Sequence, residues 1–126
     1  MRTLIIGGPV VGKTTLAKEM AHDRTVRHAD DLMKDHGWSE ASEAVAGWIN
    51  EPHSIIEGTA VVRGLRKWLD KNPGIPLTDT EIVVMTEPLA HRSDGQNAMA
   101  KGVQTIWDGV AKDVQARGAK VRRVIV

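Results

Sequence analysis

The residues with the clearest chemistry form the segment IIGGPVVGKTT, at positions 5–15. Its spacing, G-x-x-x-x-G-K-[ST], lets the backbone curl so that successive N–H groups point at phosphate oxygens. The lysine of this pattern reaches the β- and γ-phosphates, and the hydroxyl after it holds Mg²⁺. The segment therefore predicts a site for a nucleoside triphosphate and magnesium, formed by Gly7, Gly8, Val11, Gly12, Lys13, Thr14 and Thr15.

Acidic and basic residues at three later points suit phosphoryl transfer. Asp30 and Asp31 follow residues 25–29, where a carboxylate could orient or deprotonate an incoming hydroxyl; a helix N-cap is the alternative. Glu57 could complete the magnesium shell, directly or through water, unless it is only an acid at the edge of a loop. Arg92 lies in a polar stretch with the composition of a lid and could cover the transferring group; a solvated loop arginine is the alternative.

Short strands alternate with amphipathic helices along the chain. Apolar runs predict strands at 2–7, 25–29, 54–58, 81–86 and 121–126. Between them, helical spacing predicts a helix at 13–22, a helical turn at 31–36, a helix capped by Ser39, a helix from Val62 to Leu69 and a long helix from Ala100 to Val114. This alternation predicts an α/β fold with a parallel sheet covered on both faces. Ligands of such sheets bind at the carboxyl ends of the strands.

Length and composition describe one ordinary globular domain spanning 1–126. The net charge of +1 does not indicate a polyanionic partner. The chain has no cysteine, which excludes disulfides, thiolate zinc sites and cysteine nucleophiles. No apolar run is long enough to span a membrane. We expect a cytoplasmic protein without a membrane partner, and the sequence leaves the oligomeric state open.

Four tryptophans are the only aromatic residues apart from histidine: Trp38, Trp48, Trp68 and Trp107. We expect each of them to lie in the core or at its edge, because large rings dominate burial. Stacking of one of them on a base is the alternative.

With these motifs in view, the chain resembles the P-loop kinases that include polynucleotide kinases and small nucleoside, nucleotide and shikimate-type kinases, and especially short ones encoded by bacteriophages. The resemblance covers nearly the whole chain and rests on GGPVVGKTT, HADD, IIEGT and NAMAKGVQTIWDGV. Only the first motif is highly specific. The resemblance implies a three-layer sandwich with sheet order 2-3-1-4-5, a short lid around 87–101, and transfer of the γ-phosphate of ATP to a hydroxyl.

Residue roles follow from the same resemblance. Asp30 matches the acid that activates the 5′-hydroxyl in polynucleotide kinases, and Glu57 matches acids at the end of the third strand. Arg92 matches the lid arginines, with Lys101 a weaker second candidate. Phosphate or substrate anchors of the group match Arg63 and Arg66.

The chain also departs from that pattern. Met33 occupies the region where polynucleotide kinases carry an arginine, so that contact is missing unless Lys34 substitutes. The lid offers one clear arginine and His91. We expect adenine to be held by little more than the ARGAK turn, at 116–120, and the base of the lid, with weak base selectivity as the result.

Kinase activity is the leading functional prediction, with the acceptor a nucleic-acid end, a nucleoside or another small molecule. Asp30 favours a neutral hydroxyl, because a carboxylate repels a second phosphate. The near-neutral charge argues mildly against long polynucleotides, although a local track could form from Arg24, Arg27, Arg63, Arg66 and Lys67. The alternatives are a nucleotide-dependent switch or weak ATPase acting through a partner, and a nonhydrolysing nucleotide-binding module. The sequence does not distinguish ATP from GTP, or decide whether Asp31 or Lys101 has a catalytic role.

Overall fold

Five parallel strands form one sheet in the order β2-β3-β1-β4-β5. The structure is a computed structural model that describes residues 1–34 and 36–124. The strands are β1 (Arg2–Gly7), β2 (Thr25–His28), β3 (Ser54–Gly58), β4 (Thr80–Met85) and β5 (Lys120–Val124). The expected sheet and strand order are confirmed. The last two residues of the strand predicted at 121–126 lie outside the described residues.

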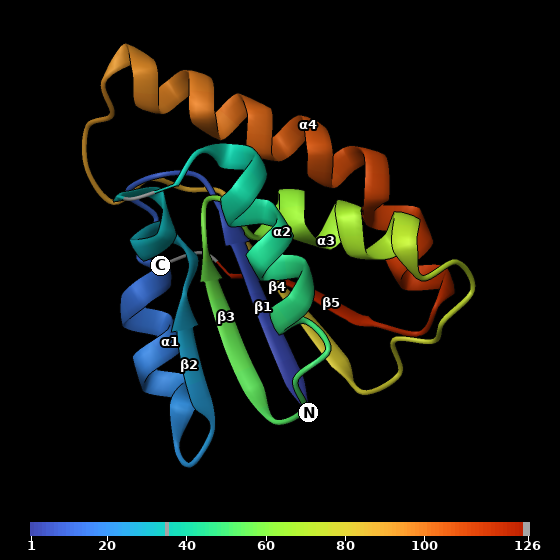
Figure 1. The fold of residues 1–126 in the computed structure, drawn as a ribbon. Coiled ribbons are helices and arrows are strands. Elements are labelled where there is room, and N and C mark those ends of the chain that lie inside the picture. The colour runs from blue at the N-terminus through green and yellow to red at the C-terminus, as the bar shows by residue number, and fades with distance from the viewer. Residues whose placement is uncertain (35, 125–126) are drawn as a thin grey trace.

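Helices cover both faces of the sheet, in unequal numbers (Figure 1). One face packs against α1 (Lys13–Ala21) through Ile5, Ile55 and Val83. The other face carries α2 (Trp38–Trp48), α3 (Val61–Lys71) and α4 (Asp94–Ala116). A 3-10 helix, η1 (Ala29–Lys34), follows β2. The result is the expected three-layer α/β arrangement, because buried parallel strands must be covered on both sides.

Two helix starts differ from the sequence prediction. Helix α2 begins at Trp38 after Gly37, and no side chain caps it, so the predicted Ser39 cap is wrong. Helix α4 begins at Asp94, before the apolar stripe that starts at Ala100, because Ser93 and Gln96 form a reciprocal capping box. The second half of the expected lid is therefore the start of α4, and only residues 87–93 are irregular.

The tryptophans occupy the core or its edge, as expected. Trp68 and Trp107 are buried in the cluster beneath α2, α3 and α4. Trp38 and Trp48 are half-buried and pack against the same cluster. The indole of Trp38 also lines a cleft at the carboxyl ends of the strands, described below. Core packing alone does not require this position.

Close packing of α2 on α3 depends on Gly64. A Cβ at this position would lie 2.3 Å from Cγ1 and 2.5 Å from Cβ of Val45. We expect Gly64→Ala to destabilise the fold by about 1–3 kcal/mol, because the two helices must move apart. Gly109→Ala is the matched control: nothing lies within 4 Å of its Cβ position in α4, so it should stabilise by about 0.5–1 kcal/mol. Urea unfolding of both variants measures this, and equal effects of the two substitutions would contradict the packing argument.

Candidate active site

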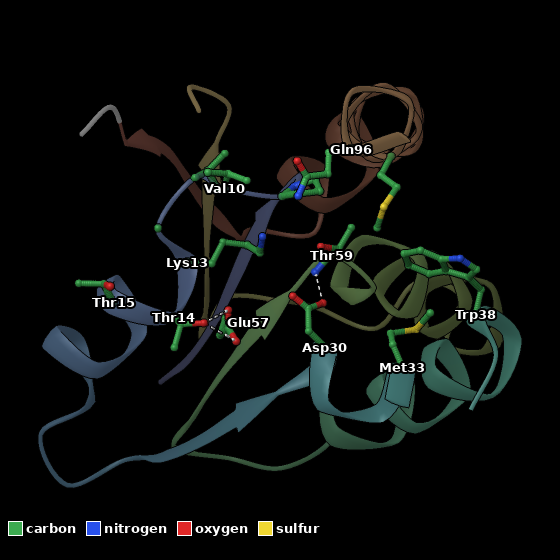
Figure 2. A pocket seen from close by; sticks show the side chains of 14 residues that line it. Val10, Lys13, Thr14, Thr15, Asp30, Met33, Trp38, Glu57, Thr59 and Gln96 are labelled. Carbon is green, nitrogen blue, oxygen red and sulfur yellow. Dashed lines mark hydrogen bonds between the residues drawn. The ribbon is translucent and has the colours of Figure 1, made fainter. Parts of the chain in front are cut away.

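A cleft of about 490 Å³ opens where β1, β2 and β3 end. Figure 2 shows Lys13 and Thr14 on one side, Met33 and Trp38 on the other, and Asp30 with Thr59 between them. Residues 9–15 form the first wall, and Glu57, Gln96 and Met99 complete the lining. The carboxyl edge of the sheet therefore brings together the predicted phosphate-binding segment and two of the predicted acids.

The phosphate-binding segment joins β1 to α1 in a loop that needs its glycines. A Cβ on Gly7 would lie 2.6 Å from the Met85 carbonyl oxygen, and one on Gly8 would lie 2.7 Å from the Ala100 Cβ. Gly12 adopts φ of 89°, a left-handed conformation, directly before the first turn of α1. The loop thus presents the amino end of a helix to the cleft, a favourable environment for an anion.

Lys13 reaches back over this loop. Its Nζ donates a hydrogen bond to the Gly8 carbonyl oxygen at 2.6 Å, and the residue is only 6% exposed. Burial lowers the pKa of Lys13, while the nearby carboxylates of Asp30 and Glu57 act in the opposite direction. A buried ammonium with one backbone acceptor gains most from an anion placed beside it.

Thr14 and Glu57 form the candidate magnesium site. The Thr14 hydroxyl lies 3.2 Å from Oε1 and 3.3 Å from Oε2 of Glu57, whose side chain is almost completely buried. In residues 1–34 and 36–124 no three His, Cys, Asp or Glu side chains form a cluster that could hold a metal ion. Magnesium bound with a nucleotide requires only one or two protein oxygens, because phosphate and water complete its shell. The donor set of Thr14 and Glu57 fits that requirement.

His28 supports Glu57 from the neighbouring strand. Parallel pairing aligns His28 with Glu57, and Nδ1 lies 2.9 Å from Oε1. Since a carboxylate only accepts hydrogen bonds, Nδ1 is the donor. The sequence prediction missed this residue. Its position two residues before Asp30, on a predicted strand next to the one that carries Glu57, could have indicated the contact.

Removing the His28 donor should weaken magnesium binding. We expect His28→Ala to raise the Mg²⁺ concentration needed for half-maximal nucleotide binding by about tenfold, because outer partners of a metal ligand hold its orientation. His28→Asn keeps a donor near the Nδ1 position and should behave more like the wild type. His36→Ala is the control, since His36 contacts exposed Glu40. A fluorescent nucleotide titrated with Mg²⁺ measures the effect; identical midpoints in the alanine and wild-type proteins would contradict it.

Asp30 lies at the middle of the cleft and is held by one of its oxygens. Oδ1 accepts a hydrogen bond from the Thr59 backbone N–H at 2.8 Å. This approach requires Gly58, whose φ is 142° and whose Cβ position would lie 3.1 Å from Oδ1 of Asp30. Among the described residues, Oδ2 has no protein hydrogen-bond partner. The carboxylate is therefore oriented, with one oxygen left for a ligand. Its neighbour Asp31 is exposed and lies near Lys34, at 3.7 Å.

The lid segment contacts the outer side of the phosphate loop. Arg92 Nε donates to the Pro9 carbonyl oxygen at 2.8 Å, and the Leu89 N–H donates to the Val10 carbonyl oxygen at 2.7 Å. Arg92 Nη2 is buried and has no hydrogen-bond partner among the described residues. Val10 adopts φ of 65°, a strained conformation for a β-branched residue. In this arrangement Arg92 supports the loop from behind instead of entering the main cleft, so its predicted contact with the phosphoryl group stays a prediction.

The other predicted basic residues lie away from the cleft lining. Arg63 stacks on the ring of Trp38 at 4.8 Å from its centroid. Arg66 lines a separate groove between α3 and α4. Lys101 lines a second hollow beside Arg92, on the outer side of the loop. The structure thus brings Arg63 only into contact with a cleft residue, Trp38, and does not bring Arg66 to the site.

The basic residues proposed as a local track do not form one. Arg24 donates to Thr3 and to the Met20 carbonyl oxygen on the α1 side of the sheet. Arg66 lies on the opposite side, between α3 and α4. Arg27 is engaged by Glu51 and by the ring of Trp48. The expected track, which also included Arg63 and Lys67, is therefore wrong.

The turn at 116–120 is also placed differently from the prediction. It precedes β5, and the Arg117 carbonyl oxygen accepts from the Leu77 N–H, ahead of β4. Because all strands are parallel, this turn lies at the amino ends of the strands, opposite the phosphate loop. It cannot contact a base whose phosphates occupy that loop, so the adenine contact proposed for this turn is wrong.

Strand order and loop position together define the fold class. A glycine-rich loop with the spacing G-x-x-x-x-G-K-[ST] follows the central strand of a parallel sheet ordered 2-3-1-4-5, as in a P-loop-type α/β fold. No model of a known protein family matches the chain, and a search of curated proteins found no match. Within the described residues, no helix is both long and apolar enough to cross a membrane.

Proposed function

We propose that the protein is a P-loop kinase that transfers the γ-phosphate of ATP to a hydroxyl. One observation carries the proposal: a single cleft joins the phosphate loop to a second compartment, with the Asp30 carboxylate at the junction. A switch or an ATPase needs room only for water beyond the γ-phosphate. The compartment bounded by Met33, Trp38 and Met99 offers room for an acceptor.

Each step of the transfer has a residue placed to assist it. The loop amides and Lys13 would hold the β- and γ-phosphates, and Thr14 with Glu57 would hold Mg²⁺. Magnesium supplies charge neutralisation on the phosphate oxygens. The acceptor oxygen attacks the γ-phosphorus, the bond from that phosphorus to the β–γ bridging oxygen breaks, and ADP leaves. Asp30 Oδ2 would receive the hydroxyl proton as the new bond forms.

We also propose a cellular location for the reaction and a charge for its acceptor. ATP, magnesium and a chain without cysteine are all compatible with the cytoplasm, which we propose as its location. Asp30 favours an uncharged hydroxyl over a phosphate acceptor, because two negative groups in this position repel.

Transfer of radiolabel from γ-labelled ATP tests the function. The panel contains sugars, nucleosides, aromatic alcohols and 5′-hydroxyl oligonucleotides, and the expected result is label on at least one acceptor. Steady ATP hydrolysis with no labelled acceptor would instead favour the ATPase or switch. Failure to bind ATP at all would overturn both readings.

A further inference from the structure

The half of the cleft beyond Asp30 has an apolar wall. We call it the acceptor half and define it by Met33, Trp38, Thr59 and Met99. Its wall carries an indole, two thioethers and one threonine. Asp30, at its entrance, is the nearest ionisable group in the lining, and Glu57 belongs to the magnesium end. Among the described lining residues, no arginine or lysine other than Lys13 faces the cleft.

The basic side chains of the elements around this half do not line it. Arg63 lies against the Trp38 ring and is absent from the cleft lining. Lys67 donates to the Ser39 carbonyl oxygen and pairs with Glu43 at 3.4 Å. Lys34, the position that could have replaced a missing arginine, is exposed and lies beside Asp31. A phosphate entering the acceptor half would therefore lose water without gaining a lysine or arginine from the described lining of that half.

These surroundings select for both charge and shape. Asp30 repels a second negative group at the reacting position. Indole and thioether side chains bind flat apolar rings through offset stacking and sulfur–aromatic contacts. The cleft of about 490 Å³ must also accommodate the terminal phosphates of ATP, which limits the acceptor to a small molecule.

We propose that the acceptor is a small, uncharged alcohol that carries a flat ring, held between Trp38 and the methionines while its hydroxyl reaches Asp30. This inference rests on the proposed kinase function and narrows it. The Asp30 carboxylate disfavours the end of a nucleic-acid strand with its phosphates. The described lining of the acceptor half also has no lysine or arginine to bind those phosphates.

Direct binding tests the inference without requiring turnover. The full chain is loaded with Mg²⁺ and a nonhydrolysable ATP analogue and then titrated, by ligand-observed NMR and calorimetry, with benzyl alcohol and the four deoxynucleosides. Each deoxynucleoside is compared with its 3′-monophosphate, which adds only the phosphate, and with 2-deoxyribose, which lacks the flat base. We expect at least one ring-bearing alcohol to bind, and its phosphorylated or base-free counterpart to bind about tenfold more weakly.

Two matched variants locate the site. Trp38→Ala should weaken binding of that alcohol by about tenfold while nucleotide affinity is unchanged. Trp48→Ala is the control, because Trp48 is also half-buried and stacked by an arginine, Arg27, but does not line the cleft. Thermal melts of both variants show that they are folded, and Trp38→Phe, which retains a ring, should recover most of the binding.

Three binding outcomes would overturn the inference. They are tighter binding of the 3′-monophosphates, equal binding of 2-deoxyribose, and equal loss in the Trp38 and Trp48 alanine variants. Transfer of label to 5′-hydroxyl oligonucleotides in preference to nucleosides would also overturn it, while leaving the kinase function standing. Conversely, ring binding without transfer to any acceptor would overturn the kinase function and support the binding site.

Discussion

Lys13→Ala should abolish phosphoryl transfer, lowering kcat/KM by about 10³-fold. The expected size reflects the loss of a preorganised cation beside the charge that develops on the transferring group. In the present structure Nζ is buried, and among the described residues it is bonded only to the Gly8 carbonyl oxygen, so it has no large structural task there. The measurement is steady-state transfer from γ-labelled ATP, with fluorescent-nucleotide titration to separate binding from chemistry.

The pH dependence of stability in a second variant, Lys13→Met, gives a readout that does not depend on activity. Burial lowers the pKa of Lys13, so the unfolded chain binds more protons than the folded one as pH rises toward the ordinary lysine pKa. The stability contributed by this residue therefore rises with pH through that window and is lowest at neutral pH. Lys13→Met should remove this pH dependence and unfold no more easily than the wild type at pH 7. Lys112→Ala, on the exposed side of α4, is the control for activity, and a matching loss there would contradict the assignment.

Asp30→Asn should lower the rate of transfer by about 10²–10³-fold while nucleotide binding is retained. The asparagine side-chain oxygen can still accept from the Thr59 N–H, so the loop keeps its geometry and only the base is removed. Asp31→Asn is the matched control, because that neighbouring carboxylate is exposed and faces Lys34. It should stay within about twofold of the wild type.

Single-turnover transfer to an identified acceptor measures the Asp30 effect, and fluorescent-nucleotide titration of the same variant checks that nucleotide binding is retained. Equal transfer by Asp30→Asn and the wild type would eliminate the general-base role and leave Asp30 only as a residue that orients Thr59.

The phosphate loop and the sheet could be predicted from the sequence because both depend on local patterns. The loop chemistry is contained in the spacing from Gly7 to Thr14, and short apolar runs separated by amphipathic helices have few packing solutions other than a covered parallel sheet. The same topology placed Asp30 and Glu57 at the edge where β1 ends. The parallel topology also places the turn at 116–120 at the opposite edge of the sheet, which the prediction of an adenine contact did not take into account.

Long basic side chains were much harder to assign. Arg63 and Arg66 both follow β3 on α3, yet one stacks on Trp38 and the other faces α4. Residues three positions apart on a helix are neighbours, but their side chains point in different directions. The neighbouring helices therefore decide where each guanidinium lies. Arg92 likewise donates to the Pro9 carbonyl oxygen, a contact between residues 83 positions apart that no local pattern specifies.

By itself, then, the sequence determined a P-loop-type fold and the edge of the sheet on which two acids stand, and it predicted that the loop at this edge binds a triphosphate. Only the tertiary structure decided how those acids are held and what lies opposite them. The contact of His28 with Glu57 depends on strand register, and the position of Trp38 over the cleft depends on the packing of α2 against α3. Spacing along a chain specifies local conformation, whereas contacts between distant elements are selected by the packing of the whole core.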